Sequence, residues 1–432
     1  MVHRSSEAFQ PRSVVRRNRN AADLLVDEVM NTDLAFCAEL TDGIWKNLFK
    51  TLKAVCDRQN QRAAAWQDFL KRAQRNTMTR HTQLDVGGRV SEETFAHLAG
   101  GKAGAIPMLP VIPRLGSVTG RGNRWGVILA GGDGVRLRPL TKLICGDDRP
   151  KQFCPLFDGR TLLEQTLQRS ERTIPREQIL VSLTSRHSKW YSRDPALRRS
   201  QLVVQPANKD TAPPILHSLL SLAQLDAQAL VAILPCDHHY SDEESFASAL
   251  ECAFETAAER TDSVVLLGAK PDYPEVEYGW IELGSPLGHE GSELFRVRGF
   301  REKPAIDVAR RLLQQGSVWN TFVMVGHVQA FLQMVQATLP DLLSMLGSAR
   351  MWRGKETHIG YSLYERVPSV SFSRRVLSAE TDQLVVLRLN QVGWSDLGDP
   401  GRAFMAARET GYEPGWIQDW VRAKGVAVAA LE

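Results

Sequence analysis

The sequence predicts an α/β protein with a mixed, mostly parallel central sheet and an added N-terminal helical extension. From Trp125 onward, short apolar runs alternate with helical patterns, which is typical of consecutive βαβ units. A glycine-rich turn directly follows the first of these runs. The 432 residues are also too many for one ordinary compact domain, so we expect a large domain with a smaller region beside it.

Each element of this fold follows from local patterning. Short apolar runs bounded by turn-forming residues predict strands over Trp125–Ala130, Ile179–Thr184, Leu202–Gln205, Leu230–Leu234 and Ser263–Gly268. Apolar residues that recur with a helical period predict helices over Thr161–Arg172, Ala212–Ala227, Glu243–Glu259, Ile306–Gln314 and Val328–Thr338. Parallel sheets of this kind bind ligands beyond the carboxyl ends of their strands.

Composition divides the chain into five segments. Residues 1–20 are expected to form a disordered basic tail, and residues 21–85 a helical extension whose apolar residues share one helix face. Glycines and prolines mark 86–122 as a linker. We expect the α/β domain over 123–415 and a helical tail over 416–432. The helices of the extension need a partner surface, which can be the main domain, each other or a second subunit, so a homo-oligomer stays open.

Positive charge is concentrated near the N-terminus. The chain has a formal net charge of +4, and its first 120 residues hold 17 Lys and Arg against 12 Asp and Glu. This pattern is compatible with an anionic partner, such as a membrane surface, or with a solvated tail. No motif with base-reading chemistry accompanies the charge, so the sequence does not favour nucleic acid as the partner.

Apolar runs and cysteine spacing bear on the cellular compartment. No run approaches the roughly 18–20 apolar residues that a membrane span needs. No apolar segment follows the early arginines as it would in a signal peptide. The six cysteines form no Cys-x-x-Cys pair. We therefore expect reduced thiols, no thiolate metal site, no transmembrane segment and a cytoplasmic location.

A candidate phosphate-binding loop follows the first predicted strand. Gly131, Gly132 and Gly134 would let backbone N–H groups approach an anion, and Lys151 follows nearby with a compact positive charge. The loop is not a P-loop, because no Gly-Lys-Ser/Thr follows, and it lacks the third glycine of a dinucleotide fingerprint. Taken alone, the loop is equally compatible with a tight turn that binds nothing.

Seven ordered motifs together resemble the sugar-1-phosphate nucleotidyltransferase family, and most closely its mannose-1-phosphate guanylyltransferase branch. They are Leu129-Ala130-Gly131-Gly132-x-Gly134-x-Arg136-Leu137 with Arg149-Pro150-Lys151-Gln152-Phe153, Gln205 to Pro213, Leu234-Pro235-Cys236-Asp237-His238, Tyr278-Gly279-Trp280-Ile281, Arg301-Glu302-Lys303-Pro304, Trp319-Asn320 and Gly393-Trp394-Ser395-Asp396-Leu397-Gly398. The resemblance covers residues 124–405. It implies a Rossmann-like three-layer nucleotidyltransferase domain.

The resemblance also implies roles for particular side chains. Arg136, Lys151, Asp237 and Asp396 would form the catalytic group, with both aspartates as ligands of Mg²⁺ and both cations neutralising the triphosphate. The nucleotide-binding residues would be Gly131, Gly132, Gly134, Gln205, Asn208 and Thr211. The sugar-phosphate-binding residues would be Gly279, Glu302, Lys303 and Asn320.

The implied activity is transfer of a nucleotidyl group from GTP to mannose 1-phosphate, which gives GDP-mannose and pyrophosphate by direct in-line displacement. The attacking phosphate oxygen is already ionised, so no general base is required, and His238 and His239 are expected to be structural. Two other interpretations stay open. The substrates could be another nucleoside triphosphate and sugar 1-phosphate, or the chain could be a non-catalytic homologue that binds nucleotide sugar and regulates a partner. The basic extension could also tether the chain to a partner or an anionic surface.

Several residues depart from the family pattern. Val135 stands where threonine is common, and Lys209-Asp210 replaces the more usual Arg-Gly. Thr321-Phe322 replaces Ser-Gly beside the expected sugar pocket, and Ser369 to Ser373 falls where an acidic residue is usual. These changes bear on the identity of base and sugar more than on the chemistry. The chain ends soon after Asp396, so we do not expect the cupin-type isomerase domain of the long bifunctional relatives.

Overall fold

The computed structural model describes residues 121–288, 291–347, 350–353, 356–390, 392–411 and 413–424. These residues lie within one structural unit, Ile106–Glu432. The predicted tail over 1–20, the helical extension over 21–85 and almost all of the linker over 86–122 lie outside the described residues. Residues 425–432 of the predicted C-terminal tail also lie outside them.

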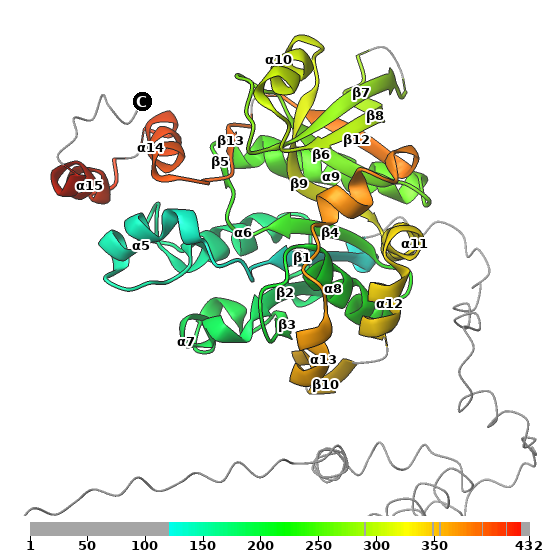
Figure 1. Ribbon diagram of the computed structural model, residues 1–432, viewed down its shortest axis with the longest axis horizontal. Helices are drawn as coiled ribbons and strands as arrows, with labels where there is room; N and C mark the ends of the chain where they lie inside the picture. Colours follow the sequence, from blue (N-terminus) through cyan, green and yellow to red (C-terminus); the bar gives the residue numbers. More distant parts are fainter. Residues whose placement is uncertain are drawn as a thin grey trace, which may run out of the picture. The chain divides into compact units, whose positions relative to one another are not determined.

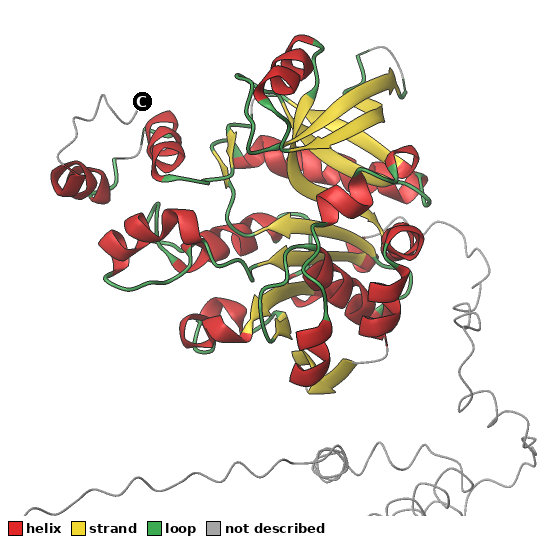
Figure 2. Ribbon diagram, viewed as in Figure 1, coloured by secondary structure: helices red, strands yellow, loops and turns green. Residues whose placement is uncertain are grey.

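A sheet of eleven strands forms the centre of the described unit (Figures 1 and 2). Its strands are β1 Arg124–Leu129, β2 Ile179–Thr184, β3 Gln201–Gln205, β4 Leu230–Pro235, β6 Val264–Ala269, β7 Gly279–Pro286, β8 Leu294–Glu302, β9 Val318–His327, β10 Arg350–Arg353, β11 Glu356–Ile359 and β12 Leu384–Leu389. Their order across the sheet is β10-β11-β3-β2-β1-β4-β9-β6-β12-β8-β7. A separate two-stranded sheet pairs β5 His239–Tyr240 with β13 Trp394–Ser395.

The sheet is mixed, and its two halves differ in strand direction. In the first half, β1 is parallel to both β2 and β4, and β3 and β11 continue the parallel array. In the second half, β9 runs antiparallel to β4, β6 and β7, and β8 runs antiparallel to β7 and β12. The predicted α/β fold with a mixed sheet is therefore confirmed. Parallel pairing is concentrated in the first half and in the pair β6–β12, because β7, β8 and β9, which the sequence did not predict, pair antiparallel.

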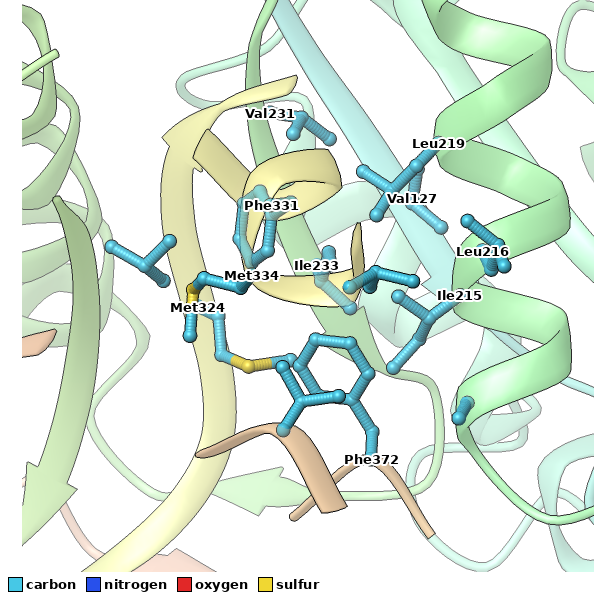
Figure 3. Packing of buried hydrophobic residues seen from close by; sticks show 14 of the residues in the cluster. Val127, Ile215, Leu216, Leu219, Val231, Ile233, Met324, Phe331, Met334 and Phe372 are labelled. Carbon is cyan, nitrogen blue, oxygen red and sulfur yellow. The ribbon is translucent and has the colours of Figure 1, made fainter. Parts of the chain in front are cut away.

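Helices cover both faces of the sheet and give three layers. The main helices are α6 Leu162–Ser170, α8 Ala212–Leu225, α9 Glu243–Glu259, α10 Ile306–Gln314, α11 Val328–Thr338 and α12 Pro340–Gly347. Neighbouring residues of β1 face opposite sides, so Val127 joins the core with α8 and α11, and Ile128 joins the core with α6 and α9. Figure 3 shows the first of these cores, in which Leu219 of α8 lies beside Val127. The predicted three-layer arrangement is confirmed.

Predicted element boundaries agree closely with the structure. The strand Ile179–Thr184 and the helices Glu243–Glu259, Ile306–Gln314 and Val328–Thr338 have the predicted bounds. The helix predicted from Thr161 begins one residue later, because Thr161 is its N-cap. The Thr161 hydroxyl accepts a hydrogen bond from Glu164 N at 3.2 Å, and the Glu164 carboxylate accepts one from Thr161 N at 2.7 Å.

A smaller core ties the helix after the glycine-rich loop to the C-terminal helices. The helices involved are α5 Arg138–Cys145, α14 Pro400–Glu409 and α15 Trp416–Lys424. Leu140, Leu397 and Trp416 are among its buried residues. Because Leu397 directly follows Asp396, this core holds the segment that carries Asp396 against the region of the glycine-rich loop.

Among the described residues, no helix is long and apolar enough to cross a membrane. The described cysteines, Cys145, Cys154, Cys236 and Cys252, are free thiols.

Candidate active site

The glycine-rich loop leaves the carboxyl end of β1 in a conformation that needs its glycines. Gly134 has a φ of +56°, and a Cβ at this position would lie 2.9 Å from Lys151 N. A Cβ at Gly131 would lie 2.9 Å from Thr184 Oγ1. Both contacts are closer than real Cβ atoms tolerate, so a side chain at either position would displace the loop.

The buried side chain of Gln152 fixes the backbone of this loop by hydrogen bonds. The side chain is 2% exposed, and its Nε2 donates hydrogen bonds to Ala130 O at 2.9 Å and Gly132 O at 2.8 Å. Carbonyl groups of the loop are thereby held toward the protein, which leaves its N–H groups for a ligand. Gln152 belongs to the Lys151-Gln152-Phe153 motif, but the sequence did not indicate this role.

Lys151 links the glycine-rich loop to both predicted metal ligands. Its Nζ donates hydrogen bonds to Asp396 O at 2.7 Å and to Leu397 O at 3.1 Å, and it lies 3.3 Å from Asp237 Oδ2. A buried ammonium group is stable when it is paired and hydrogen-bonded in this way. Three of the four residues predicted to be catalytic therefore meet around one ammonium group.

Three donors converge on one oxygen of the Asp396 carboxylate. Oδ1 accepts hydrogen bonds from Tyr278 Oη and Gly398 N, both at 2.9 Å, and from Arg402 Nη1 at 2.8 Å. Burial raises the pKa of Asp396, but Arg402 and Lys151 outweigh this effect and hold the pKa below its ordinary value. The carboxylate is therefore ionised and fixed in orientation.

Arg402 of α14 is a site residue that the sequence did not predict. Besides Asp396, its guanidinium group pairs with the buried carboxylate of Glu275, and it lies 4.6 Å from the centroid of the Tyr278 ring. Arg402 thus compensates two buried carboxylates at once. No local motif marks it, because Arg402 and Glu275 are 127 residues apart in the chain.

Burial favours the neutral form of the two histidines after Asp237. Trp394 Nε1 donates a hydrogen bond to His238 Nδ1 at 3.1 Å, and burial lowers the pKa of His238. His239 lies with its ring centroid 5.0 Å from that of Phe157, and burial lowers the pKa of His239 to about 4. These contacts are compatible with the predicted structural roles of both side chains.

Arg136 and Lys303 share an acidic partner that the sequence did not predict. Arg136 Nη1 lies 3.5 Å from Glu277 Oε2, and Lys303 Nζ lies 3.4 Å from the same oxygen. Arg136 comes from the segment after β1, whereas Lys303 follows the end of β8. The fold therefore brings together the cation predicted for the triphosphate and the cation predicted for the sugar phosphate.

Gln205 and Thr211, predicted to bind nucleotide, are also held by the protein. Gln205 Oε1 accepts a hydrogen bond from Tyr364 Oη, and Gln205 Nε2 donates one to Ser182 Oγ at 3.3 Å. Thr211 Oγ1 accepts a hydrogen bond from Phe372 N at 2.8 Å. These contacts orient both side chains at the wall of the cleft.

Asn208 and Asp210 form a turn before α8. Asn208 Nδ2 donates a hydrogen bond to Asp133 Oδ2 at 3.1 Å. Asp210 adopts a φ of +65°, which favours glycine, and its Oδ1 accepts a hydrogen bond from Thr211 N at 2.8 Å. One oxygen of the Asp210 carboxylate therefore stabilises the turn by accepting a backbone hydrogen bond.

Gly279, Glu302 and Asn320 pack tightly where the sugar phosphate is predicted to bind. A Cβ at Gly279 would lie 2.8 Å from Glu302 Oε2 and 3.3 Å from Asn320 Cβ, so a side chain at this position would push the Glu302 carboxylate aside. Burial raises the pKa of Glu302 above its ordinary value. Asn320 Oδ1 accepts a hydrogen bond from Phe322 N at 3.0 Å, which fixes the amide group.

Phe322 and Arg374 also line this end of the cleft. Phe322 has a φ of +60°, in the region that favours glycine, and it lines the cleft as the sequence departure suggested. Arg374 lies in a π-helical turn, Ser373–Leu377, and lines both this cleft and a neighbouring hollow. Such turns are frequent at functional sites. The sequence singled out the segment Ser369 to Ser373 but not the arginine that follows it.

All but one of the predicted site residues line a single cleft of about 860 Å³, which is within the usual size range of ligand sites. They are Gly131, Gly132, Arg136, Lys151, Gln205, Asn208, Thr211, Asp237, Gly279, Glu302, Lys303, Asn320 and Asp396. The exception is Gly134, which packs against the backbone of Lys151. The cleft lies beyond the carboxyl ends of β1, β3 and β4, where ligands bind in sheets of this kind.

Asp237 and Asp396 fit a Mg²⁺ ion that substrate phosphates help to bind. Mg²⁺ commonly uses one or two carboxylates and completes its octahedron with waters and phosphate oxygens. The hydrogen bonds to Asp396 fall on Oδ1, and the Asp237 side chain is 31% exposed. Among the described residues, no group of three or more His, Cys, Asp or Glu side chains could hold a metal ion. Two carboxylates are the number that Mg²⁺ commonly takes from a protein, with its other positions filled by waters and phosphate oxygens.

A known protein family matches the part of the chain that forms the cleft. The nucleotidyl transferase family model matches residues 125–411, which include every predicted site residue. This chain belongs to the nucleotidyl transferase family. The predicted membership of the sugar-1-phosphate nucleotidyltransferases is confirmed, because relatives and solved structures of that kind match this chain.

Several mannose-1-phosphate guanylyltransferases are among the relatives of this nucleotidyl transferase. The xanthan biosynthesis protein XanB of Xanthomonas campestris pv. campestris (strain B100) is 28% identical over 282 residues, which are 63% of this chain and 57% of that protein. The mannose-1-phosphate guanylyltransferase ManC of Salmonella typhimurium (strain LT2) is 28% identical over 286 residues, with the same coverage of 63% and 57%. The chain thus spans less than two thirds of the length of these relatives.

A solved structure supports the fold of the transferase domain. A protein described as a mannose-1-phosphate geranyltransferase from Thermus thermophilus is 29% identical, with a TM-score of 0.57, and the match covers 68% of this chain and 80% of that one. A mannose-6-phosphate isomerase from Helicobacter pylori has a TM-score of 0.51 at 20% identity, which concerns the fold alone.

Proposed function

We propose that this chain catalyses Mg²⁺-dependent transfer of a nucleotidyl group from GTP to mannose 1-phosphate, which gives GDP-mannose and pyrophosphate. The observation that carries the proposal is the convergence of Arg136, Lys151, Lys303, Asp237 and Asp396 on one cleft. The names of the relatives support GTP and mannose 1-phosphate as the substrates. A cytoplasmic location and assembly into a homo-oligomer stay predictions.

The proposed reaction is a direct displacement at phosphorus. An oxygen of the sugar phosphate attacks the α-phosphorus of the triphosphate, a new P–O bond forms, and the P–O bond to pyrophosphate breaks. The nucleophile is already an anion, so no side chain needs to remove a proton. Two polyanions must instead be held close together and in line, which requires fixed positive charge.

The chain supplies this charge from two directions. Lys151, held by two backbone carbonyls, is proposed to bind the triphosphate beside the N–H groups of the glycine-rich loop, and Arg136 is proposed to neutralise charge that develops on it. Lys303 is proposed to bind the sugar phosphate, with Glu302 and Asn320 directed at sugar hydroxyls. Asp237 and Asp396 would hold Mg²⁺, which supplies further neutralisation of phosphate charge when it is bound.

One observation favours a second candidate, in which the sugar is not mannose. Phe322 places an aromatic ring in the cleft at a residue whose backbone conformation favours glycine, next to Asn320. A large side chain beside Asn320 would affect which sugar 1-phosphate can bind in the cleft. The chemistry would then be unchanged, and the substrate pair would differ.

Pyrophosphate release tests the proposal. GTP, ATP, UTP and dTTP are each combined with mannose 1-phosphate and glucose 1-phosphate in the presence of Mg²⁺, with wild type and Asp237→Asn. We expect turnover with GTP and mannose 1-phosphate, and its loss in the variant. Turnover with another pair would replace the substrates but keep the reaction. Absence of turnover with every pair, in a protein that still binds nucleotide sugar, would refute the enzyme and favour a regulatory homologue.

A further inference from the structure

Glu277 lies between the two substrate sites, and nothing in the proposed chemistry requires it. We propose that Glu277 couples the binding of the two substrates, because its carboxylate holds Arg136 and Lys303 in the substrate-free cleft and is displaced when a substrate phosphate arrives. This inference rests on the proposed function, since it takes Arg136 as a ligand of the triphosphate and Lys303 as a ligand of the sugar phosphate.

One oxygen of Glu277 serves both cations. Oε2 lies 3.5 Å from Arg136 Nη1 and 3.4 Å from Lys303 Nζ. The two nitrogens are therefore within about 7 Å of each other, and like charges at that distance repel unless an anion lies between them. In the substrate-free cleft Glu277 is that anion, and in the loaded cleft the phosphates take its place.

The backbone near Glu277 is anchored, so displacement needs movement of the side chain alone. Glu277 N donates a hydrogen bond to Glu275 Oε1 at 2.7 Å, and Arg402 holds the Glu275 carboxylate. Lys303 N donates a hydrogen bond to Tyr278 O at 3.0 Å, which fixes the two segments to each other. The Glu277 side chain is 47% exposed, so its carboxylate can turn into water.

Sharing of one oxygen makes the two substrates cooperate. The first phosphate to bind must break one ion pair and move the carboxylate aside, and the second phosphate then finds its cation already released. Because an exposed ion pair is weak, its release changes a binding constant by about 2-fold to 5-fold. Linkage is reciprocal, so each substrate should tighten the binding of the other by the same factor.

The test measures binding without turnover. Calorimetry gives the Kd of mannose 1-phosphate in the absence and presence of saturating α,β-methylene GTP, which cannot release pyrophosphate. In the wild type we expect the analogue to lower this Kd by about 2-fold to 5-fold. In Glu277→Gln, the factor should fall to about 1, and both ligands should bind more tightly than to the wild type.

Glu282→Gln is a matched control, since Glu282 also pairs with two cations, Arg298 and Arg301, at 3.5 Å and 3.1 Å, but does not line the catalytic cleft. It should keep the wild-type coupling. Inorganic pyrophosphate is a second probe that does not depend on the identity of the substrates, and it should bind Glu277→Gln more tightly than wild type, with a smaller difference at high salt.

Two results would overturn the inference: wild-type coupling in Glu277→Gln, or unchanged affinity of that variant for pyrophosphate. If Glu277→Gln does not fold, Glu277→Ala is measured in its place. The proposed function fails separately, when the wild type turns over no substrate pair. In that case tighter binding of pyrophosphate by the Glu277 variants would still support the role of Glu277 as the anion displaced from the two cations.

Discussion

At one end of the cleft Lys151 has three oxygen neighbours within 3.3 Å and is buried, whereas at the other end Lys303 is 40% exposed and pairs with an exposed glutamate. We call the first the phosphate end (Lys151, Asp237, Asp396 and Arg402) and the second the sugar end (Glu302, Lys303, Asn320 and Phe322). The charged groups of the phosphate end are held by partners within the protein, and the sugar end keeps exposed charge. This difference suggests that the chemistry is preorganised while the choice of sugar is adjustable.

The two ends are also supported differently. Asp396 is held by three hydrogen bonds, and its segment is packed through Leu397 into the core that joins α5, α14 and α15. At the sugar end, Lys303 pairs with the exposed Glu277. A positive φ, which costs non-glycine residues energy, occurs at both ends, at Leu397 beside Asp396 as well as at Lys303 and Phe322. Strain of this kind persists where surrounding contacts impose it, and it often accompanies function.

The largest predicted effect compares the two lysines. Lys151→Met removes the ammonium group that Asp237 and two carbonyl groups share, and we expect kcat to fall by roughly 1000-fold, as for loss of a preorganised charge. Lys303→Met removes a more exposed cation. We expect kcat/KM to fall by about 30-fold in this variant, mainly because the KM of the sugar phosphate rises. Steady-state kinetics of both variants with the substrates of the wild type gives the comparison.

A larger loss of kcat in Lys303→Met than in Lys151→Met would reverse the assignment of the two ends. Thermal unfolding serves as the control, because a buried group left without its partner costs about 1–3 kcal/mol. If Lys151→Met unfolded far below the assay temperature, the loss of kcat would result from unfolding and not from the missing charge.

The second prediction is that the protein loses stability at acid pH through His239, which lies next to the phosphate end. His239 pairs with Ser395 in the small sheet, two residues after Asp237 and directly before Asp396 along the two strands. Burial lowers the pKa of His239 from 6.5 to about 4. The unfolded chain therefore binds a proton between those values while the folded chain does not. Stability is complete above pH 6.5 and falls as the pH decreases toward 4, by up to about 3 kcal/mol. Urea unfolding at pH 7.5 and pH 5 measures this loss.

His239→Phe should reduce the pH dependence, since neither ring nitrogen of His239 has a hydrogen-bond partner in the described structure and Phe157 packs beside the ring. The other histidines whose pKa burial lowers, His187, His238 and His327, should leave the variant a smaller dependence of stability on pH. If the free energy of unfolding of His239→Phe depended on pH as strongly as that of the wild type, groups other than His239 would cause the acid sensitivity.

The sequence singled out residues in contiguous motifs and missed residues that act through long-range ion pairs, for a physical reason. Gly131 and Asp237 lie in contiguous motifs just after buried strands, and Lys151 lies in the contiguous motif Arg149 to Phe153, so local sequence marks all three. Arg402 and Glu277 act through ion pairs between segments more than a hundred residues apart in the chain, and no periodicity encodes such a pair. Strands β7, β8 and β9 were likewise not predicted, and register shifts in the β7–β8 and β6–β9 pairs interrupt the regular alternation that would mark them.

The smallest predicted effect concerns Phe322 and sharpens the assignment of specificity to the sugar end. Phe322→Gly relieves a positive φ, which favours the variant by about 1 kcal/mol, and loses the packing of a half-buried ring, which costs a similar amount. We therefore expect little change in stability.

The ring lines the cleft beside Asn320, so its removal should change discrimination between sugar 1-phosphates by about 10-fold, as for other single changes in pocket volume. Asp210→Gly is the matched control, because Asp210 also has a positive φ and lines the cleft on the side of the nucleotide. It should change the KM of the triphosphate and leave the ratio of kcat/KM values for mannose 1-phosphate and glucose 1-phosphate as in the wild type. If Asp210→Gly moved that ratio as much as Phe322→Gly, selection of the sugar would belong to the whole cleft and not to one end of it.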